Sequence, residues 1–129
     1  MSVGKSIYYL LSNASGVTSI VSTRIYPSRI PQIKDFPAIS YHKVAHVPTN
    51  QKDRVSGFDK EDFDIICWGK NYLQLNTLSA AVRTALDRIA ISSQGATIDT
   101  IVFVSEVDNF NDEAEIFQRN MQFKFIVKR

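Results

Sequence analysis

The sequence predicts an α+β fold: a four-stranded, largely antiparallel sheet with two main helices packed on one face. Two observations predict this fold. Apolar residues recur every three or four positions in two segments, which is the period of a helix, and at every second position in others, which is the period of a strand. The segments follow one another as helix, strand, strand, helix, strand, strand. In that order, both helices are expected to cover the apolar face of one sheet.

The two main helices are predicted at residues 3–13 and 72–89, with a short helical turn at 17–21. Ser2 and Asn71 precede them and are favourable N-cap residues. The apolar stripe of the first helix consists of Val3, Ile7, Leu10, Leu11 and Ala14. The stripe of the second consists of Tyr72, Leu75, Leu78, Val82, Leu86 and Ile89. Each stripe covers one side of its helix and is expected to be buried.

Four strands are predicted at residues 38–47, 62–68, 97–107 and 117–127. The last has the clearest alternation. Its odd positions carry the apolar residues Phe117, Met121, Phe123, Phe125 and Val127. Its even positions carry the polar residues Gln118, Asn120, Gln122, Lys124 and Lys128. This strand should therefore turn one face to the core, against the stripe of the second helix, and the other face to water.

The segments between these elements are of two kinds. Residues 24–31 contain two prolines and are expected to be extended chain with turns. Residues 47–60 show no apolar period and are rich in polar residues. A structureless segment of this length is unusual in a compact domain and is typically functional or disordered. We therefore expect one domain over residues 1–129 with a mobile loop at 47–60.

Composition excludes several classes of protein. The chain has 129 residues, a net charge of +2 and one cysteine. The single cysteine excludes an internal disulfide and a Cys-based zinc ribbon. The small net charge does not favour a nucleic-acid binder, and no apolar run is long enough for a membrane span or the core of a signal peptide. We expect a soluble, cytoplasmic protein that binds neither a membrane nor a specific nucleic-acid sequence.

Little in the sequence points to catalysis or to a cofactor. Phosphate-binding glycine loops, the GxSxG motif and the HExxH motif are all missing. His42 and His46 would lie about 13 Å apart on a straight strand, too far to share a metal. Cys67 lies in an apolar run and is expected in the core. Asp62 and Asp64 share one strand face, so a small cytoplasmic enzyme that uses them is an alternative hypothesis.

Three stretches together resemble the tail-completion proteins of long-tailed, non-contractile bacteriophages and their prophage relatives. The first comprises residues 4–12 (GKSIYYLLS), 17–21 (VTSIV) and 23–27 (TRIYP), similar to the family's opening helix, helical turn and Arg-Ile-Tyr-Pro stretch. The second is residues 35–41 (DFPAISY), which resemble the Phe-Pro entry into a strand. The third comprises residues 64–69 (DIICWG) and 80–86 (AAVRTAL), which resemble a strand ending in Cys-Trp-Gly and a helix ending in Val-Arg-x-Ala-Leu.

The resemblance implies a structural virion protein without catalysis or cofactor. Such proteins form a ring, usually a hexamer, at the head-proximal end of the tail tube. The ring terminates the tube and joins it to the head connector. The implied partners are further copies of the chain, the tail tube protein and the connector or stopper protein. The implied location is the virion tail or neck, after assembly in the host cytoplasm. Another neck component, a stopper or adaptor, is an alternative, although adaptors are mostly helical.

An uneven charge distribution suggests where subunits could meet. Residues 1–60 hold eight basic and three acidic residues, and residues 61–129 hold seven basic and ten acidic residues. Because a ring joins two different faces of one subunit, we expect an acidic and a basic face. The candidate acidic residues are Glu106, Asp108, Asp112, Glu113 and Glu115. The candidate basic residues are Arg24, Arg29, Lys52 and Arg54. The candidate apolar anchors are Phe58, Trp68 and Phe110.

Overall fold

The computed structural model describes residues 3–28, 36–51, 54–92, 96–111 and 115–128; at 46–51, 54–58 and 111 it describes the backbone alone. The elements in chain order are α1 (Val3–Ser12), α2 (Ser15–Val21), β1 (Ile25–Pro27), β2 (Ala38–Gln51), β3 (Arg54–Gly69), α3 (Tyr72–Leu86), β4 (Thr97–Asn111) and β5 (Ile116–Lys128). The predicted α+β class and the predicted order of elements are confirmed.

The strands form one five-stranded sheet in the order β1-β2-β3-β5-β4. β2, β3, β5 and β4 are antiparallel neighbours, and β1 pairs in parallel with β2. The sequence predicted four strands, so β1 is an addition. It lies in the proline-containing stretch expected to be extended chain, and it joins the sheet because the Ser28 amide donates to the Tyr41 carbonyl oxygen at 2.7 Å. With only three residues, β1 is too short to show the two-residue period of a strand, and two prolines lie within or near it.

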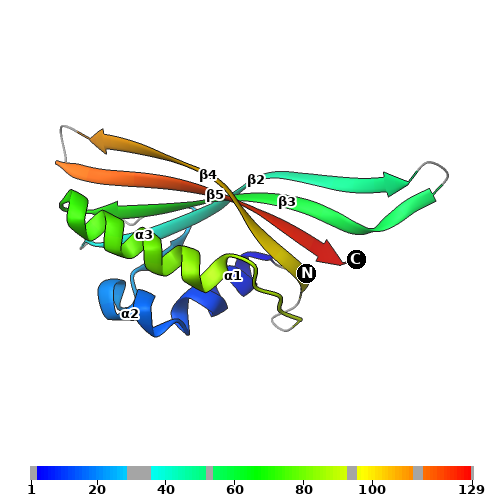
Figure 1. Ribbon diagram of the computed structural model, residues 1–129, viewed down its shortest axis with the longest axis horizontal. Coiled ribbons are helices and arrows are strands. Elements are labelled where there is room, and N and C mark those ends of the chain that lie inside the picture. The colour runs from blue at the N-terminus through cyan, green and yellow to red at the C-terminus, as the bar shows by residue number, and fades with distance from the viewer. Residues whose placement is uncertain (1–2, 29–35, 52–53, 93–95, 112–114, 129) are drawn as a thin grey trace.

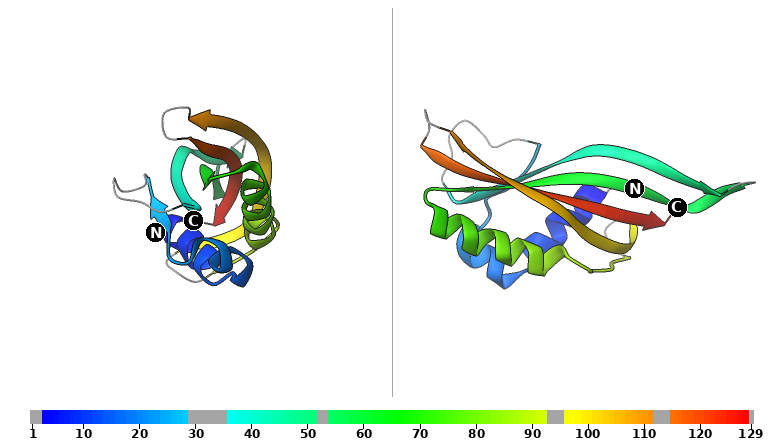
Figure 2. Two further views of the ribbon diagram at one scale, coloured as in Figure 1. Left: turned by 90° about the vertical axis from the view of Figure 1, so that its left-hand side faces the viewer. Right: turned by 45° about the horizontal axis from the view of Figure 1, so that its top comes forward.

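All three helices lie on one side of the sheet (Figures 1 and 2). α3 begins at Tyr72 as predicted, and the Asn71 side chain caps it by accepting a hydrogen bond from the Gln74 amide at 2.8 Å. α3 ends at Leu86, before the predicted Ile89, because the Arg88 amide turns to the Ile101 carbonyl oxygen of β4 at 2.7 Å. No helix in the described parts of the chain has the length and apolar character that crossing a bilayer requires.

The core fills the space between the helices and the sheet. Met121, Phe123 and Phe125 of β5 are buried in one cluster with the apolar stripe of α3, which consists of Leu75, Leu78, Val82 and Leu86. This is the pairing that the sequence predicted. Phe117, at the start of β5, packs on the edge of the cluster and is partly buried. The alternation of apolar and polar residues along β5 therefore indicates which face of the strand packs against the helices.

The prediction of a structureless loop at residues 47–60 is wrong for the residues that the structure describes. β2 continues through Gln51 and β3 begins at Arg54, and their backbones pair as far as Gln51 with Arg54. In Figure 1 this hairpin extends beyond the other strands at one end of the sheet. β3 pairs with β5 only from Phe58 onward, whereas Arg54 and Val55 pair with β2 alone. The polar sequence of this segment has no apolar alternation, so its strand pairing could not be predicted from a period. The mobility of this hairpin in the free chain stays a prediction.

Candidate assembly interface

A buried arginine lies where β4, β5 and α3 meet. Arg119 takes an odd position of β5, so its side chain turns toward the helices, between Phe117 and Met121. The residue is 6% exposed. A buried charge that lost its partner would cost several kcal/mol, so its contacts matter for the stability of this end of the sheet.

Acceptors from two elements surround the guanidinium group. Arg119 donates from Nε and Nη2 to the two carboxylate oxygens of Asp108, at 2.6 and 3.0 Å. Its Nη1 donates to Ser79 Oγ of α3 at 2.8 Å. Glu106 Oε2 lies 3.4 Å from Nε, and the guanidinium carbon lies 5.5 Å from the centroid of the Tyr72 ring. Arg119 thereby connects the end of the β4–β5 hairpin to the first half of α3.

The ion pair favours the charged form of both partners. The hydrogen bond from Arg119 holds the pKa of the Asp108 carboxyl below its ordinary value, although partial burial opposes the shift. The same hydrogen bond, with the nearby charges of Asp108 and Glu106, raises the pKa of Arg119. Glu106 and Asp108, two of the acidic residues expected on an assembly face, are therefore in ion pairs with an arginine of their own chain.

Aromatic side chains border this ion pair. The rings of Phe110 and Phe117 lie 4.7 Å apart between centroids, and Tyr72 meets Phe117 edge-on at 6.4 Å. Tyr72 and Phe110 remain exposed, and the next residue of α3, Leu73, is 76% exposed. Exposed aromatic residues are enriched in protein interfaces, where they supply most of the binding energy. This end of the molecule therefore has the composition of a docking surface.

The remaining acidic candidates lie close to this surface in the sequence. Glu115 is exposed and has a φ of 54° just before β5. Asp112 and Glu113 lie outside the described residues. The acidic candidates that the structure describes thus flank the β4–β5 turn.

Of the basic candidates, Arg24 lies at the other edge of the sheet. Arg24 precedes β1, and its Nε donates to the Pro37 carbonyl oxygen at 2.8 Å. Arg54 is the first residue of β3, where the backbone alone is described. Arg29 and Lys52 lie outside the described residues. The sheet order therefore separates Arg24 from the acidic residues of β4 by the width of the sheet.

The three apolar candidates differ in their surroundings. Phe110 is exposed on β4. Trp68 is half-buried on the sheet face away from the helices, where its Nε1 donates to Ser40 Oγ at 3.0 Å and its ring stacks on Phe36 at 6.1 Å. The Trp68 side chain is therefore already engaged within its own chain. For Phe58 the backbone alone is described.

The residues considered for catalysis belong to the sheet. Asp64 accepts a hydrogen bond from Asn120 Nδ2 at 3.1 Å, and His42 Nε2 lies 3.6 Å from it. Asp62 shares that strand face, which carries no helix in the described structure. Burial raises the pKa of the Cys67 thiol to about 12, which opposes a nucleophilic role. Nowhere in the described residues do three metal-ligating side chains gather.

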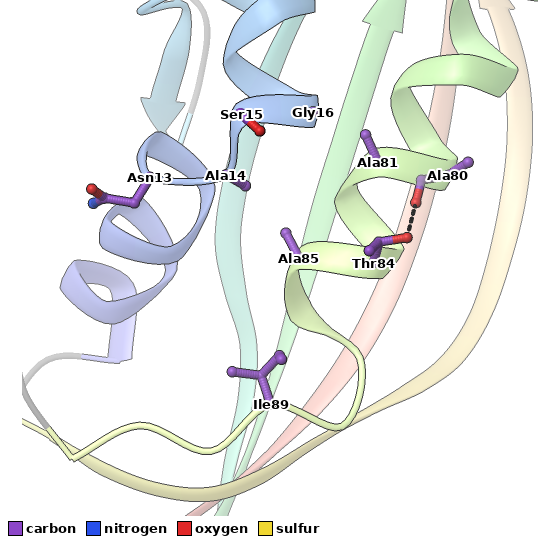
Figure 3. Close-up of a pocket in the computed structure, with 9 residues that line it drawn as sticks. All are labelled: Asn13, Ala14, Ser15, Gly16, Ala80, Ala81, Thr84, Ala85 and Ile89. Atoms are coloured by element: carbon purple, nitrogen blue, oxygen red, sulfur yellow. Dashed lines mark hydrogen bonds between the residues drawn. The ribbon is translucent and has the colours of Figure 1, made fainter.

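A hollow lies between the α1–α2 turn and α3 (Figure 3). Small side chains line it, including Ala14, Gly16, Ala81 and Ala85. Figure 3 shows that Thr84 turns its hydroxyl back to its own helix, where it donates to the Ala80 carbonyl oxygen at 3.0 Å. The polar side chains of Asn13 and Ser15 also line the hollow.

Reasoning from the sequence missed Arg119, although a signal was present. In the alternation of the last strand, Arg119 occupies an odd position among apolar residues. A charge in such a position requires a buried partner. The nearby run of acidic residues, from Glu106 onward, offered that partner. The same acidic run also predicts an external surface, and that interpretation leaves no acidic partner for Arg119.

Comparisons with known proteins identify the family. The family model described as tail completion protein gp17 matches residues 5–128. The chain belongs to this family. The resemblance inferred from the sequence is therefore confirmed, and the chain is a structural protein of the phage virion, in the tail or neck. No curated protein matches the chain.

Solved structures support the fold. The chain is similar to a chain of the structure titled "Virion of native gene transfer agent (GTA) particle", with a TM-score of 0.82 and 15% sequence identity. The match covers 99% of this chain and 100% of that one. At this identity the similarity shows that the two chains share a fold.

Proposed function

We propose that this chain is a tail-completion subunit that forms a ring, a hexamer, at the head-proximal end of the tail tube. The ring terminates the tube and offers its other side to the head connector. The family match over residues 5–128 carries this proposal. A five-stranded sheet argues against the mostly helical adaptor class, and the positions of Asp62 and Asp64 on a sheet face argue against an enzyme.

The distribution of surfaces supports a ring. A ring requires each subunit to present two different faces to its neighbours. The β4–β5 end carries exposed Tyr72, Leu73 and Phe110 beside acidic residues, and Arg24 lies at the opposite edge of the sheet. The two faces therefore differ in both charge and apolar content, as a head-to-tail contact needs.

Mass in solution and electron microscopy test the proposal. Mass photometry over a concentration series should show a single closed species larger than the monomer, and negative-stain images should show rings. Purified tail tubes mixed with the protein should carry the ring at one end. A chain that remains monomeric at all concentrations, in the presence and absence of tubes, would contradict the proposal.

Charge reversal tests which faces meet. The double variant Asp112→Lys, Glu113→Lys should block ring formation without unfolding the monomer. Adding Arg29→Glu and Arg54→Glu should partly restore it. The matched control is Asp99→Lys, which reverses an exposed acidic residue at the other end of β4. Rings that form equally well with the first double variant at low salt, where screening is weakest, would exclude the charge pairing.

A further inference from the structure

β4 forms one edge of the sheet, and its outer side is covered along its first half. Ile91 and Ile98 exchange two backbone hydrogen bonds, of 3.0 and 2.7 Å. Further along, the Ile101 carbonyl oxygen accepts from the Arg88 amide at 2.7 Å, and the Phe103 amide donates to Asp87 Oδ1 at 3.1 Å. The segment after α3 therefore provides hydrogen-bond partners for outward backbone groups of Ile98, Ile101 and Phe103.

The second half of β4 has no such cover. Ile101 and Phe103, which turn backbone groups outward, lie opposite Phe125 and Phe123 of β5. After the irregularity between Phe103 and Ser105, the same phase of the ladder returns at Glu106, Asp108 and Phe110, opposite Met121, Arg119 and Phe117. The amides and carbonyls of these residues point outward by the alternation of an antiparallel ladder. In the described parts of the chain, nothing pairs with them.

This free edge has the character of a strand-docking site. Exposed apolar side chains occur along it at Val104, Val107 and Phe110, with Val107 60% exposed. Natural sheets usually protect a free edge with lysine or proline, and residues 104–111 contain neither. The carboxylate of Asp108 is held on Arg119. An unprotected edge of this kind is a template for an added strand.

The opposite edge of the same sheet supplies a complementary strand. β1 covers the outer side of β2 as far as Tyr41. Beyond Tyr41, β2 has no outer neighbour in the described structure, and residues 43–48 form a second free edge. Pro48 lies opposite Asp59, in the outward phase that Ile39 and Tyr41 define, so its missing N–H costs β2 no bond to β3. The outward N–H groups that this edge offers to another strand are therefore those of Lys43 and His46.

Charge favours pairing between these two different edges. The free edge of β4 carries two carboxylates, Glu106 and Asp108, which share the one cation of Arg119. The free edge of β2 carries the half-exposed Lys43, whose ammonium group lies 2.9 Å from Glu61 Oε1 of its own chain. Two β4 edges placed together would oppose carboxylates of the same sign, which is unfavourable for directly facing strands. A β4 edge facing a β2 edge avoids this repulsion between carboxylates. The complementary occupant is therefore a second copy of this chain.

We propose that the outer edge of β4, at residues 104–111, receives the outer edge of β2, at residues 43–48, from a neighbouring copy of the chain. The contact extends the sheet from one subunit into the next. It is a head-to-tail contact, because the two edges belong to opposite sides of each subunit. It rests on the proposed ring and specifies how that ring is held together.

Hydrogen exchange on the wild-type protein tests the contact. In the free monomer, the outward amides of Glu106, Asp108 and Phe110 should exchange quickly, whereas the inward amides of Val107 and Asn109 should be protected. In the assembled ring, the outward amides should slow by about 100-fold or more, as should those of Lys43 and His46. Rings that leave the outward amides unprotected would overturn the docking edge while leaving the proposed function intact. A chain that forms no ring contradicts both proposals.

Matched proline variants provide a second test. Phe110→Pro removes an outward N–H and the ring, whereas Phe110→Ala removes the ring alone. The association constant of Phe110→Pro should fall about tenfold below that of Phe110→Ala, the loss expected for one backbone hydrogen bond. The Phe110→Pro monomer should stay folded by circular dichroism, because proline is tolerated on an edge strand. Asn109→Pro, which removes an inward bond to β5, should destabilise the monomer. Equal association of the two Phe110 variants would contradict the proposal.

Discussion

The ion pair between Arg119 and Asp108 should be a coupled, stabilising interaction rather than a surface pair. The perturbation is a double-mutant cycle with Arg119→Met, Asp108→Ala and the two together. Methionine retains much of the apolar volume of the arginine side chain, so the cycle removes the charge and the hydrogen bonds with little change in packing. The geometry is bidentate, with bonds of 2.6 and 3.0 Å, and the arginine side chain is 7% exposed.

The magnitude follows from what each variant leaves behind. Breaking a fully buried pair costs about 3–5 kcal/mol. Here the Asp108 side chain is 41% exposed, and Glu106 stays 3.4 Å from Arg119 as a second counter-ion, so the cost should be smaller. A hydrogen bond to a charged group contributes about 1.5–3 kcal/mol. We therefore expect Asp108→Ala to lower the free energy of unfolding by about 2 kcal/mol, with a coupling energy of about 1.5 kcal/mol.

Urea unfolding of the monomer, followed by circular dichroism, measures all four corners of the cycle. The slope of the unfolding free energy against urea should be the same for all four proteins, since the fold is unchanged. A coupling energy below about 0.5 kcal/mol would be typical of a solvated surface pair. That result would refute the conclusion that Arg119 fastens the β4–β5 hairpin to α3.

Three further predictions concern the monomer. Arg119 lowers the pKa of Asp108, so the pair contributes stability above the ordinary Asp pKa of about 3.9, and this contribution is lost as the pH falls through the lower folded pKa. The melting temperature of the wild type should therefore fall more steeply with acid than that of Asp108→Asn. Parallel curves for the two proteins would contradict the shift. Phe123→Ala should cost about 3–5 kcal/mol in urea unfolding, because the ring is completely buried, and a loss below about 1 kcal/mol would mean that β5 is not packed as described. The Cys67 thiol should react with a thiol reagent no faster than the chain unfolds, and rapid labelling of the native protein would disprove its burial.

The sequence by itself determined the class of fold and most of its elements. Regular periods mark chain that has one buried face, and that is why α3 and β5 were located within a few residues of their true ends. The Asn71 cap was predictable because it depends on local geometry alone. The family was also readable from the sequence, since short motifs in the right order accumulate across the whole chain.

The tertiary structure alone decided the parts of the chain whose sequence has no regular apolar period. The end of the β2–β3 hairpin has no apolar alternation in its sequence, and its pairing is seen only in the backbone register of the two strands. β1 is too short for a period, and its parallel partner lies beyond a proline-containing segment. The partner of Arg119 is set by the register of β4 against β5, which places Asp108 opposite it. Register also determines which backbone groups of β4 remain free. A free edge is a property of the whole sheet, because it depends on which strand has no neighbour, and no local stretch of sequence contains that information.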